Sequence, residues 1–180
     1  GLSVAKHGNR SVTSKCGSAD VLEALGVNIM GSQERVSESI DKTGIGFLFA
    51  PLFHDSVKNA VPVRREIGIR TVFNIIGPLT NPAHADMQII GVYDKNLVDV
   101  IAKVLVNLGV KRAMVVHGSD GLDEITLTGI SYIAEVNEGW IKNYIFDPLE
   151  YGFAYCKPED LKGGDIKSNK EIALKILSGE

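Results

Sequence analysis

The clearest pattern of hydrophobic and polar positions lies in the middle of the chain. Residues 88–93 and 113–117 are apolar runs without polar alternation, which is typical of strands buried on both faces of a sheet. Between them, residues 96–108 place apolar side chains four residues apart and end before Gly109, which predicts an amphipathic helix. This β-α-β order predicts two parallel strands joined by a right-handed crossover.

Shorter elements are predicted on either side of that unit. In the N-terminal part, the sequence predicts a strand at 2–5, a polar loop at 6–17, a helix at 18–25 and a second helix from Ser32 to a stop at Gly44. It then predicts a buried strand at 47–50, a helical stretch at 51–68 broken near Pro62, and a turn-rich loop at 73–82. The C-terminal part predicts a β-hairpin of 131–136 and 140–146, an irregular stretch at 148–165 and a helix at 170–177. We therefore expect a single α/β domain over residues 1–180.

Composition and charge exclude several classes of protein. Of the 180 residues, 44% are hydrophobic and 23% charged, which argues against disorder. The net charge of −3 gives no general cationic field for nucleic acid or an acidic membrane. No apolar run approaches the roughly 20 residues of a membrane helix. Cys16 and Cys156 are far apart and not in metal-like spacing, so we expect no disulfide and a cytoplasmic protein.

The segment from Lys6 to Ser18 is the strongest local signal for chemistry. It combines cations, an imidazole, glycines and hydroxyls between a predicted strand and a helix N-terminus. Backbone N–H groups and the helix dipole attract anions there, and glycines let the backbone approach closely. A phosphate site is favoured over a merely solvated basic loop.

The segment 118–124, Gly-Ser-Asp-Gly-Leu-Asp-Glu, is the second signal. It follows the buried strand that ends at His117, and ligands of open α/β sheets bind beyond the carboxyl ends of strands. Adjacent carboxylates suit Mg²⁺ together with water and substrate phosphates. An acidic turn with Asp caps explains the same residues equally well.

Three further features have an ordinary structural explanation. Arg64 lies in a predicted helix and could bind a carboxylate in bidentate fashion, although most helix arginines are solvated. His54 reads as a helix-surface histidine. The residues of the Gly77–Pro82 segment are explained by a structural turn alone.

Several motifs occur together in a recognisable order. They are Val4-Ala5-Lys6-His7-Gly8-Asn9-Arg10, the stretch Gly17 to Gly26, Arg64, Gly68-Ile69-Arg70-Thr71, Phe73-Asn74, Gly77 to Pro82, Gln88, Gly91-Val92 and Gly121-Leu122-Asp123-Glu124. In this order they resemble the anthranilate phosphoribosyltransferases, from Val4 to about Glu124 and more weakly beyond.

The resemblance implies a reaction and a set of site residues. The family transfers phosphoribose from phosphoribosyl pyrophosphate to the amino group of anthranilate, releasing pyrophosphate, with Mg²⁺, on the pathway to tryptophan. By similarity, the residues that hold phosphoribosyl pyrophosphate are Lys6, His7, Gly8, Asn9, Arg10, Ser11, Val12, Thr13, Ser14 and Ser18. Those on the anthranilate side are Asn9, Arg64, His7, His54 and Pro78, and those that bind Mg²⁺ are Asp123 and Glu124. No residue is identified as a dedicated general base.

The resemblance also implies a fold and marks what this sequence lacks. We expect an α/β fold with a mixed, mostly parallel central sheet, helices on both faces and an antiparallel hairpin. The family's N-terminal helical domain, its glycine-rich pyrophosphate loop and its C-terminal helices have no counterpart here, so we expect a fragment of a longer enzyme. The complete enzyme would be a homodimer, and for this chain dimerisation is in doubt.

Two other functions stay open. A pyrimidine nucleoside phosphorylase would share the fold and the phosphate site, but residues 6–10 and Arg64 weigh against it. A non-catalytic relative that binds nucleic acid would need a basic face, which the net charge of −3 and the retained Asp123 and Glu124 disfavour. We expect no nucleic-acid or membrane partner.

Overall fold

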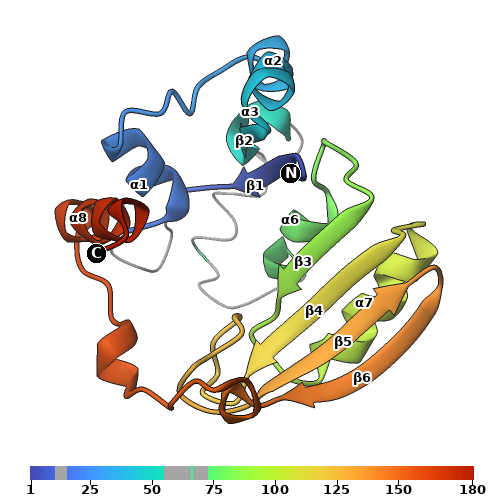
Figure 1. Cartoon of the computed structure of the whole chain (residues 1–180). Helices are drawn as coiled ribbons and strands as arrows, with labels where there is room; N and C mark the ends of the chain where they lie inside the picture. Colours follow the sequence, from blue (N-terminus) through green and yellow to red (C-terminus); the bar gives the residue numbers. More distant parts are fainter. Residues whose placement is uncertain (11–15, 55–65, 67–72) are drawn as a thin grey trace. The chain divides into compact units, whose positions relative to one another are not determined.

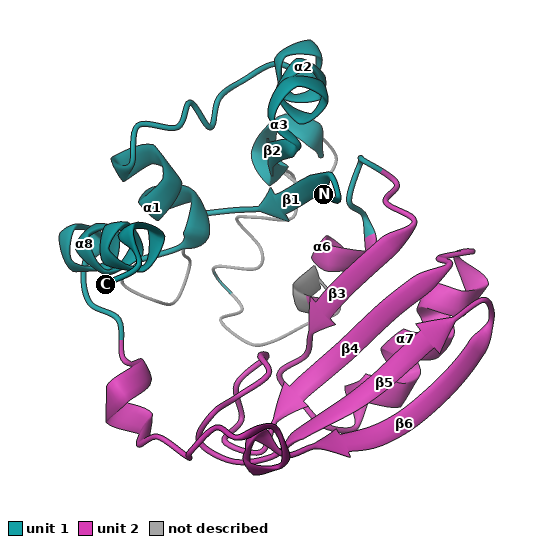
Figure 2. Ribbon diagram, in the orientation of Figure 1, with its two compact units in different colours: residues 1–74, 80–83, 163–180 teal, residues 75–79, 84–162 magenta. Residues whose placement is uncertain are grey.

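The computed structural model describes residues 1–10, 16–54, 66 and 73–180, which divide into two compact units (Figures 1 and 2). Unit 1 contains residues 1–74, 80–83 and 163–180, and unit 2 contains residues 75–79 and 84–162. Each unit is described by itself below.

Unit 1 is built on a parallel pair of strands. Strand β1 (Val4–Gly8) pairs in register with β2 (Ile45–Phe49), from Val4 opposite Ile45 to Gly8 opposite Phe49. The helices are α1 (Ser18–Ala24), α2 (Gln33–Thr43), α3 (Ala50–Phe53) and α8 (Ile166–Ser178), and α8 contacts α1. The predicted start and stop of α2 are confirmed, because Ser32 accepts a hydrogen bond from the Arg35 N–H and Gly44 is left-handed with φ 78°.

Unit 2 is built on a four-stranded mixed sheet in the order β3-β4-β5-β6. Strands β3 (Met87–Gly91) and β4 (Arg112–Gly118) are parallel, and α7 (Leu97–Asn107) connects them. Strands β5 (Ser131–Asn137) and β6 (Trp140–Phe146) add two antiparallel pairs. The other elements are α6 (Phe73–Leu79), of which residues 75–79 belong to this unit, and the 3-10 turns η1 (Pro148–Tyr151) and η2 (Pro158–Leu161).

The largest core cluster of the described residues lies between α7 and one face of this sheet. Its buried members are Ile90, Val92, Val98, Ile101, Ala102, Leu105, Ala113, Val115, Ala134 and Val136. Leu105 and Val115 have no exposed surface. Burial of this apolar area is the main stabilising term for the sheet whose carboxyl edge carries the 118–124 segment.

The structure confirms the α/β class, a mixed sheet and the predicted hairpin. The hairpin turn contains Glu138 at φ 47° and Gly139 at φ 86°, the two positive φ values of a type I′ turn. Among the described strands, two pairs are parallel and two are antiparallel. No helix in the described part of the chain is long and apolar enough to cross a membrane.

Three predicted elements are wrong in their bounds or type. The first strand runs Val4–Gly8 and not 2–5, because its pairing with β2 continues through Lys6 and His7. Residues 73–79 form helix α6 where a loop was predicted, since Pro78 stands near the helix end and removes only one N–H from the ladder. The last helix begins at Ile166 because Asp165 caps it by accepting from the Ser168 N–H. Of the helical stretch predicted at 51–68, most lies outside the described residues.

Candidate functional site

Strand β1 contains the first group of predicted site residues. Lys6, His7 and Gly8 are its last three residues, and their extended conformation follows from the parallel register with Phe47, Leu48 and Phe49. The Asn81 side-chain amide donates to the Ala5 carbonyl at 3.0 Å and so fixes the same strand from the side. Lys6 is exposed and His7 is half-buried at the carboxyl end of the strand.

His7 and His54 meet, although 47 residues separate them. Their Nε2 atoms are 3.1 Å apart and their rings make an edge-to-face contact at 70°. One Nε2 must donate and the other accept, so the tautomers of the two rings are linked. Helix α3, which directly follows β2, brings His54 back to the end of β1, and the His54 N–H donates to the Ala50 carbonyl. The structure thus joins two residues that were both expected on the anthranilate side.

Gly8 lies beneath Phe47 and Ser18. A Cβ at position 8 would stand 2.9 Å from the Phe47 ring and 3.1 Å from the Ser18 hydroxyl oxygen. The glycine leaves room for Ser18, the first residue of α1, and for the Phe47 ring at the end of β1, and a larger residue would require both side chains to shift. The Asn9 side chain is bonded to the neighbouring backbone, because its Oδ1 accepts from the Arg10 N–H at 2.8 Å.

Arg10 is paired with carboxylates of α1. Its guanidinium donates to Asp20 at 3.0 Å and to both oxygens of Glu23 at 2.8 and 3.0 Å, and it lies 5.7 Å from the centre of the Phe49 ring. The hydrogen bond to Glu23, followed by that to Asp20, raises the pKa of Arg10, and the pKa of Glu23 falls chiefly because Arg10 donates to it. Asp20 also accepts from the Gly17 N–H at 2.8 Å. In this arrangement the Arg10 guanidinium forms ion pairs with two carboxylates of α1.

The 118–124 segment lies at the carboxyl end of β4, where it was predicted. Asp123 and Glu124 are both exposed. Gly91, the last residue of β3, sets their position, because a Cβ there would lie 1.8 Å from the Asp123 carbonyl oxygen. The Asp123 backbone therefore rests directly on the end of β3, and only glycine permits it.

Asp120 is a residue that the sequence interpretation did not single out. Its Oδ1 accepts from the Leu122 N–H at 3.0 Å, and its Oδ2 accepts from the hydroxyls of Thr126 and Thr128. Burial alone would raise the pKa of Asp120, but the hydrogen bonds from Thr126, Thr128 and Leu122 outweigh it and hold that pKa below its usual value. Thr126 and Thr128 follow Asp120 in the sequence, but residue types alone do not show that their hydroxyls reach it.

The remaining predicted residues are not all described. Ser11, Val12, Thr13, Ser14 and Arg64 lie outside the described residues. Pro78 is exposed near the end of α6 in unit 2. In the part of the chain that the structure covers, no three His, Cys, Asp or Glu side chains are grouped as a metal site. Two exposed carboxylates nevertheless fit Mg²⁺, which takes one or two protein carboxylates and completes its shell with water and substrate phosphates.

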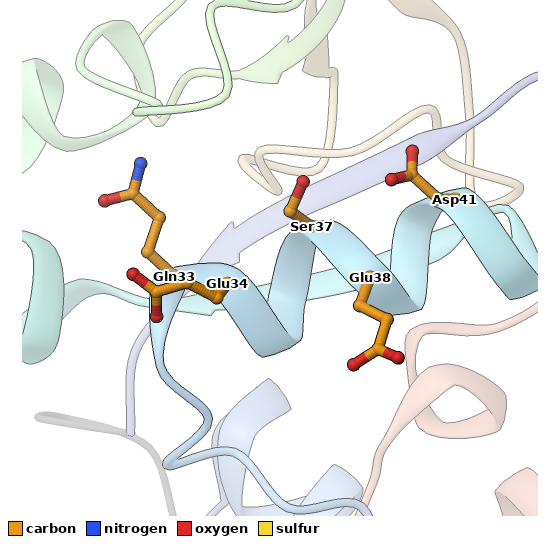
Figure 3. A pocket seen from close by; sticks show the side chains of 5 residues that line it. All are labelled: Gln33, Glu34, Ser37, Glu38 and Asp41. Carbon is orange, nitrogen blue, oxygen red and sulfur yellow. The ribbon is translucent and has the colours of Figure 1, made fainter.

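Two concavities in the described residues contain none of the predicted site residues. One, of about 540 Å³, lies along α2 and is lined by Gln33, Glu34, Ser37, Glu38 and Asp41 (Figure 3). Its three carboxylates would repel a polyanionic substrate. The other, of about 320 Å³, lies in unit 2 and includes Lys95, Tyr132 and Asn143 in its lining. The predicted site residues that the structure describes therefore lie outside both of these concavities.

Comparison with known proteins gives a consistent result. Residues 1–180 match the family described as glycosyl transferase family, a/b domain. The chain is 58% identical over 179 residues to an anthranilate phosphoribosyltransferase of Ruminiclostridium cellulolyticum, covering 99% of this chain and 52% of the relative. A similar relative from Caldanaerobacter subterraneus is 57% identical, covering 100% of this chain and 53% of its own length. The chain thus spans about half the length of the relatives it matches.

Solved structures agree with the sequence comparison. The anthranilate phosphoribosyltransferase of Thermus thermophilus matches with a TM-score of 0.92 at 47% identity, covering 100% of this chain and 53% of that one. The enzyme from Saccharomyces cerevisiae in complex with phosphoribosyl pyrophosphate and Mg matches with a TM-score of 0.87 at 29% identity, covering 97% of this chain and 48% of that one.

Proposed function

Because this chain belongs to the glycosyl transferase family through its a/b domain, we propose that it is the phosphoribosyl-transferring part of an anthranilate phosphoribosyltransferase. The observation that carries the proposal is the 58% identity to such an enzyme across 99% of the chain. The reaction moves phosphoribose from phosphoribosyl pyrophosphate to the amine of anthranilate, with pyrophosphate as the leaving group. The phosphorylase and nucleic-acid-binding alternatives have no observation in their favour.

The donor would be held by residues 6–14 and Ser18. Lys6 is exposed at the end of β1 and supplies positive charge, while backbone N–H groups and hydroxyls of the following segment supply donors for phosphate oxygens. Arg10 contributes by fixing this segment to α1 through Asp20 and Glu23. Its guanidinium already donates to these two carboxylates, so a direct contact of Arg10 with a phosphate would replace one of those hydrogen bonds.

Asp123 and Glu124 would hold Mg²⁺. A bound Mg²⁺ would neutralise charge that develops on the departing pyrophosphate. Gly91 lets the Asp123 backbone lie against the end of β3, which keeps Asp123 at the carboxyl end of the sheet. Glu124 and Asp123 are exposed there and can accept an ion from solvent.

Anthranilate would be oriented by Arg64, Asn9, His7, His54 and Pro78. Arg64 would pair with its carboxylate in a two-point hydrogen bond. The linked His7–His54 pair would present a polar edge to the acceptor. Transfer then depends mainly on positioning the amine and stabilising the leaving group, and no residue is assigned as a general base. We also propose a cytoplasmic location, in keeping with two cysteines, Cys16 and Cys156, that are far apart in the sequence and form no disulfide framework.

The test is anthranilate fluorescence, followed with and without phosphoribosyl pyrophosphate and Mg²⁺. It uses this chain and a chimera in which the flanking segments of the Ruminiclostridium cellulolyticum relative extend it at both ends. We expect the chimera to consume anthranilate only when donor and Mg²⁺ are both present, and to lose that activity on Arg64→Ala. A chimera that folds but leaves anthranilate untouched would refute the proposal. Phosphorolysis of nucleosides by the same chain would favour the phosphorylase.

A further inference from the structure

We propose that Asp120 is a positioning residue that fixes residues 118–130, the acidic loop, so that Asp123 and Glu124 face an incoming divalent cation. The inference rests on the proposed function, because it takes Asp123 and Glu124 as the metal-binding pair. Asp120 itself is assigned no ligand role.

Asp120 connects the two halves of the acidic loop. Its Oδ1 accepts from the Leu122 N–H at 3.0 Å, on the side that leaves β4. Its Oδ2 accepts from the hydroxyls of Thr126 and Thr128, on the side that returns to β5. Residues 123–125 are the segment between these two attachments, so the Asp120 side chain links the two ends of that segment.

Backbone contacts close the same loop at its base. The Gly118 N–H donates to the Leu122 carbonyl at 2.8 Å, and the Ser119 N–H donates to the Ile130 carbonyl at 2.9 Å. The Thr126 N–H donates to the Ser131 hydroxyl at 3.0 Å, and both of those residues are buried. A loop fixed at its base and across its middle loses little further conformational freedom when a cation binds at its tip.

The hydrogen bonds of Asp120 leave it poorly suited to be a ligand. Three donors already occupy its two oxygens, and a carboxylate that gave them up for a cation would release both threonine hydroxyls. Asp123 and Glu124 are exposed at the same carboxyl edge. Asp120 would therefore orient the two exposed carboxylates through the backbone of the loop, and not by a hydrogen bond to either of them.

The experiment measures Mn²⁺ binding to the intact 180-residue chain by paramagnetic broadening of backbone amide signals in NMR. Mn²⁺ stands in for Mg²⁺, and broadening detects weak sites. In the unsubstituted chain we expect broadening centred on residues 121–125, and we expect Asp123→Asn to remove it. Asp120→Asn should require at least about threefold more Mn²⁺ for the same broadening, which corresponds to about 0.6 kcal/mol of lost binding.

Two further variants separate positioning from charge and from folding. Asp86→Asn is the control for charge, because it also removes one negative charge from unit 2. Asp86 pairs with Lys111 and directly precedes β3, at the end of the strand opposite to the acidic loop, so this variant should leave the broadening unchanged. Thr128→Val removes one donor to Asp120 without removing charge and should weaken Mn²⁺ binding in the same direction as Asp120→Asn. Amide signals of α7 and β6 report whether the fold of unit 2 is kept.

The outcomes distinguish the two proposals. If the unsubstituted chain shows no broadening near Asp123, the metal assignment of the proposed function fails. If it does, but Asp120→Asn and Thr128→Val both bind Mn²⁺ as well as the unsubstituted chain, the metal assignment stands and the positioning role of Asp120 is wrong. In the active chimera, Asp120→Asn should raise the KM for phosphoribosyl pyrophosphate and leave the KM for anthranilate unchanged.

Discussion

The two segments that carry the predicted chemistry are held in opposite ways. In unit 1, Arg10 of the segment after β1 is held at the surface by Asp20 and Glu23 of α1. In unit 2, Asp120 of the acidic loop is held by threonine hydroxyls and backbone, and Gly91 admits the Asp123 backbone onto the sheet. Arg10 is thus held by ion pairs, whereas the acidic loop is held by hydrogen bonds and by close packing at Gly91. The difference shows that a charged residue inside a predicted binding motif can be paired within the fold, as Arg10 is with Asp20 and Glu23.

The largest expected effect comes from filling the space at Gly91. In Gly91→Ala the new Cβ would lie 1.8 Å from the Asp123 carbonyl oxygen, so the acidic loop must move. We expect a loss of about 1–3 kcal/mol in the free energy of unfolding, measured by urea denaturation. Gly77→Ala is the matched control, because a Cβ there meets nothing within 4 Å in helix α6, and it should leave stability unchanged or slightly raised. Equal stability of Gly91→Ala and the parent chain would contradict the close packing.

A smaller effect is expected from Asp120→Asn. The hydrogen bonds from Thr126, Thr128 and Leu122 outweigh burial and hold the pKa of Asp120 below its usual value. Its contribution is therefore complete above the unfolded-state pKa of about 3.9 and is lost as the pH falls through the lower folded-state pKa. Because the residue is exposed, we expect a loss of about 1 kcal/mol at pH 7. The difference in unfolding free energy between parent and variant should shrink below pH 4, and a constant difference down to pH 2 would rule out this origin.

The smallest effect is expected from Arg10→Ala. The ion pairs of Arg10 with Asp20 and Glu23 are exposed, so salt screens them. We expect a small fall in Tm at low ionic strength that disappears in about 1 M NaCl, measured by circular dichroism. Lys42→Ala, which breaks the exposed pair with Glu38 on α2, is the control and should behave in the same way. If Arg10→Ala instead leaves Tm unchanged and weakens donor binding in the active chimera, Arg10 is a phosphate contact and the contrast between the two segments is lost.

Much of the fold could be predicted from the sequence. The spacing of apolar residues placed α7, β3 and β4, and the Asn-Glu-Gly turn placed the β5–β6 hairpin, because those signals are local. Helix α6 could not be predicted, since Gly77 and Pro78 favour a turn when only neighbouring residues are considered. The extent of β1 depends on a partner strand about 40 residues away in sequence, which no local pattern reveals.

The candidate site was predictable in its parts and not in its pairings. The residue types in 6–18 and 118–124 indicated anion and cation chemistry, and the chain places both segments at the carboxyl ends of strands. The contact of His7 with His54 joins positions 47 residues apart and depends on the turn that α3 makes. The ion pairs of Arg10 with α1 and the hydrogen bonds of Asp120 with two threonines depend on three-dimensional distances, which residue types alone do not give.

The proposed function assigns one substrate, phosphoribosyl pyrophosphate, to both the segment after β1 and the acidic loop. The direct test measures KM for phosphoribosyl pyrophosphate and for anthranilate in the active chimera with Lys6→Ala and with Asp123→Asn. We predict that each variant raises the KM for phosphoribosyl pyrophosphate at least about tenfold, equivalent to about 1.4 kcal/mol, and leaves the KM for anthranilate unchanged. If either variant instead changes only the KM for anthranilate, or changes neither, the two segments do not share the donor and this assignment is wrong.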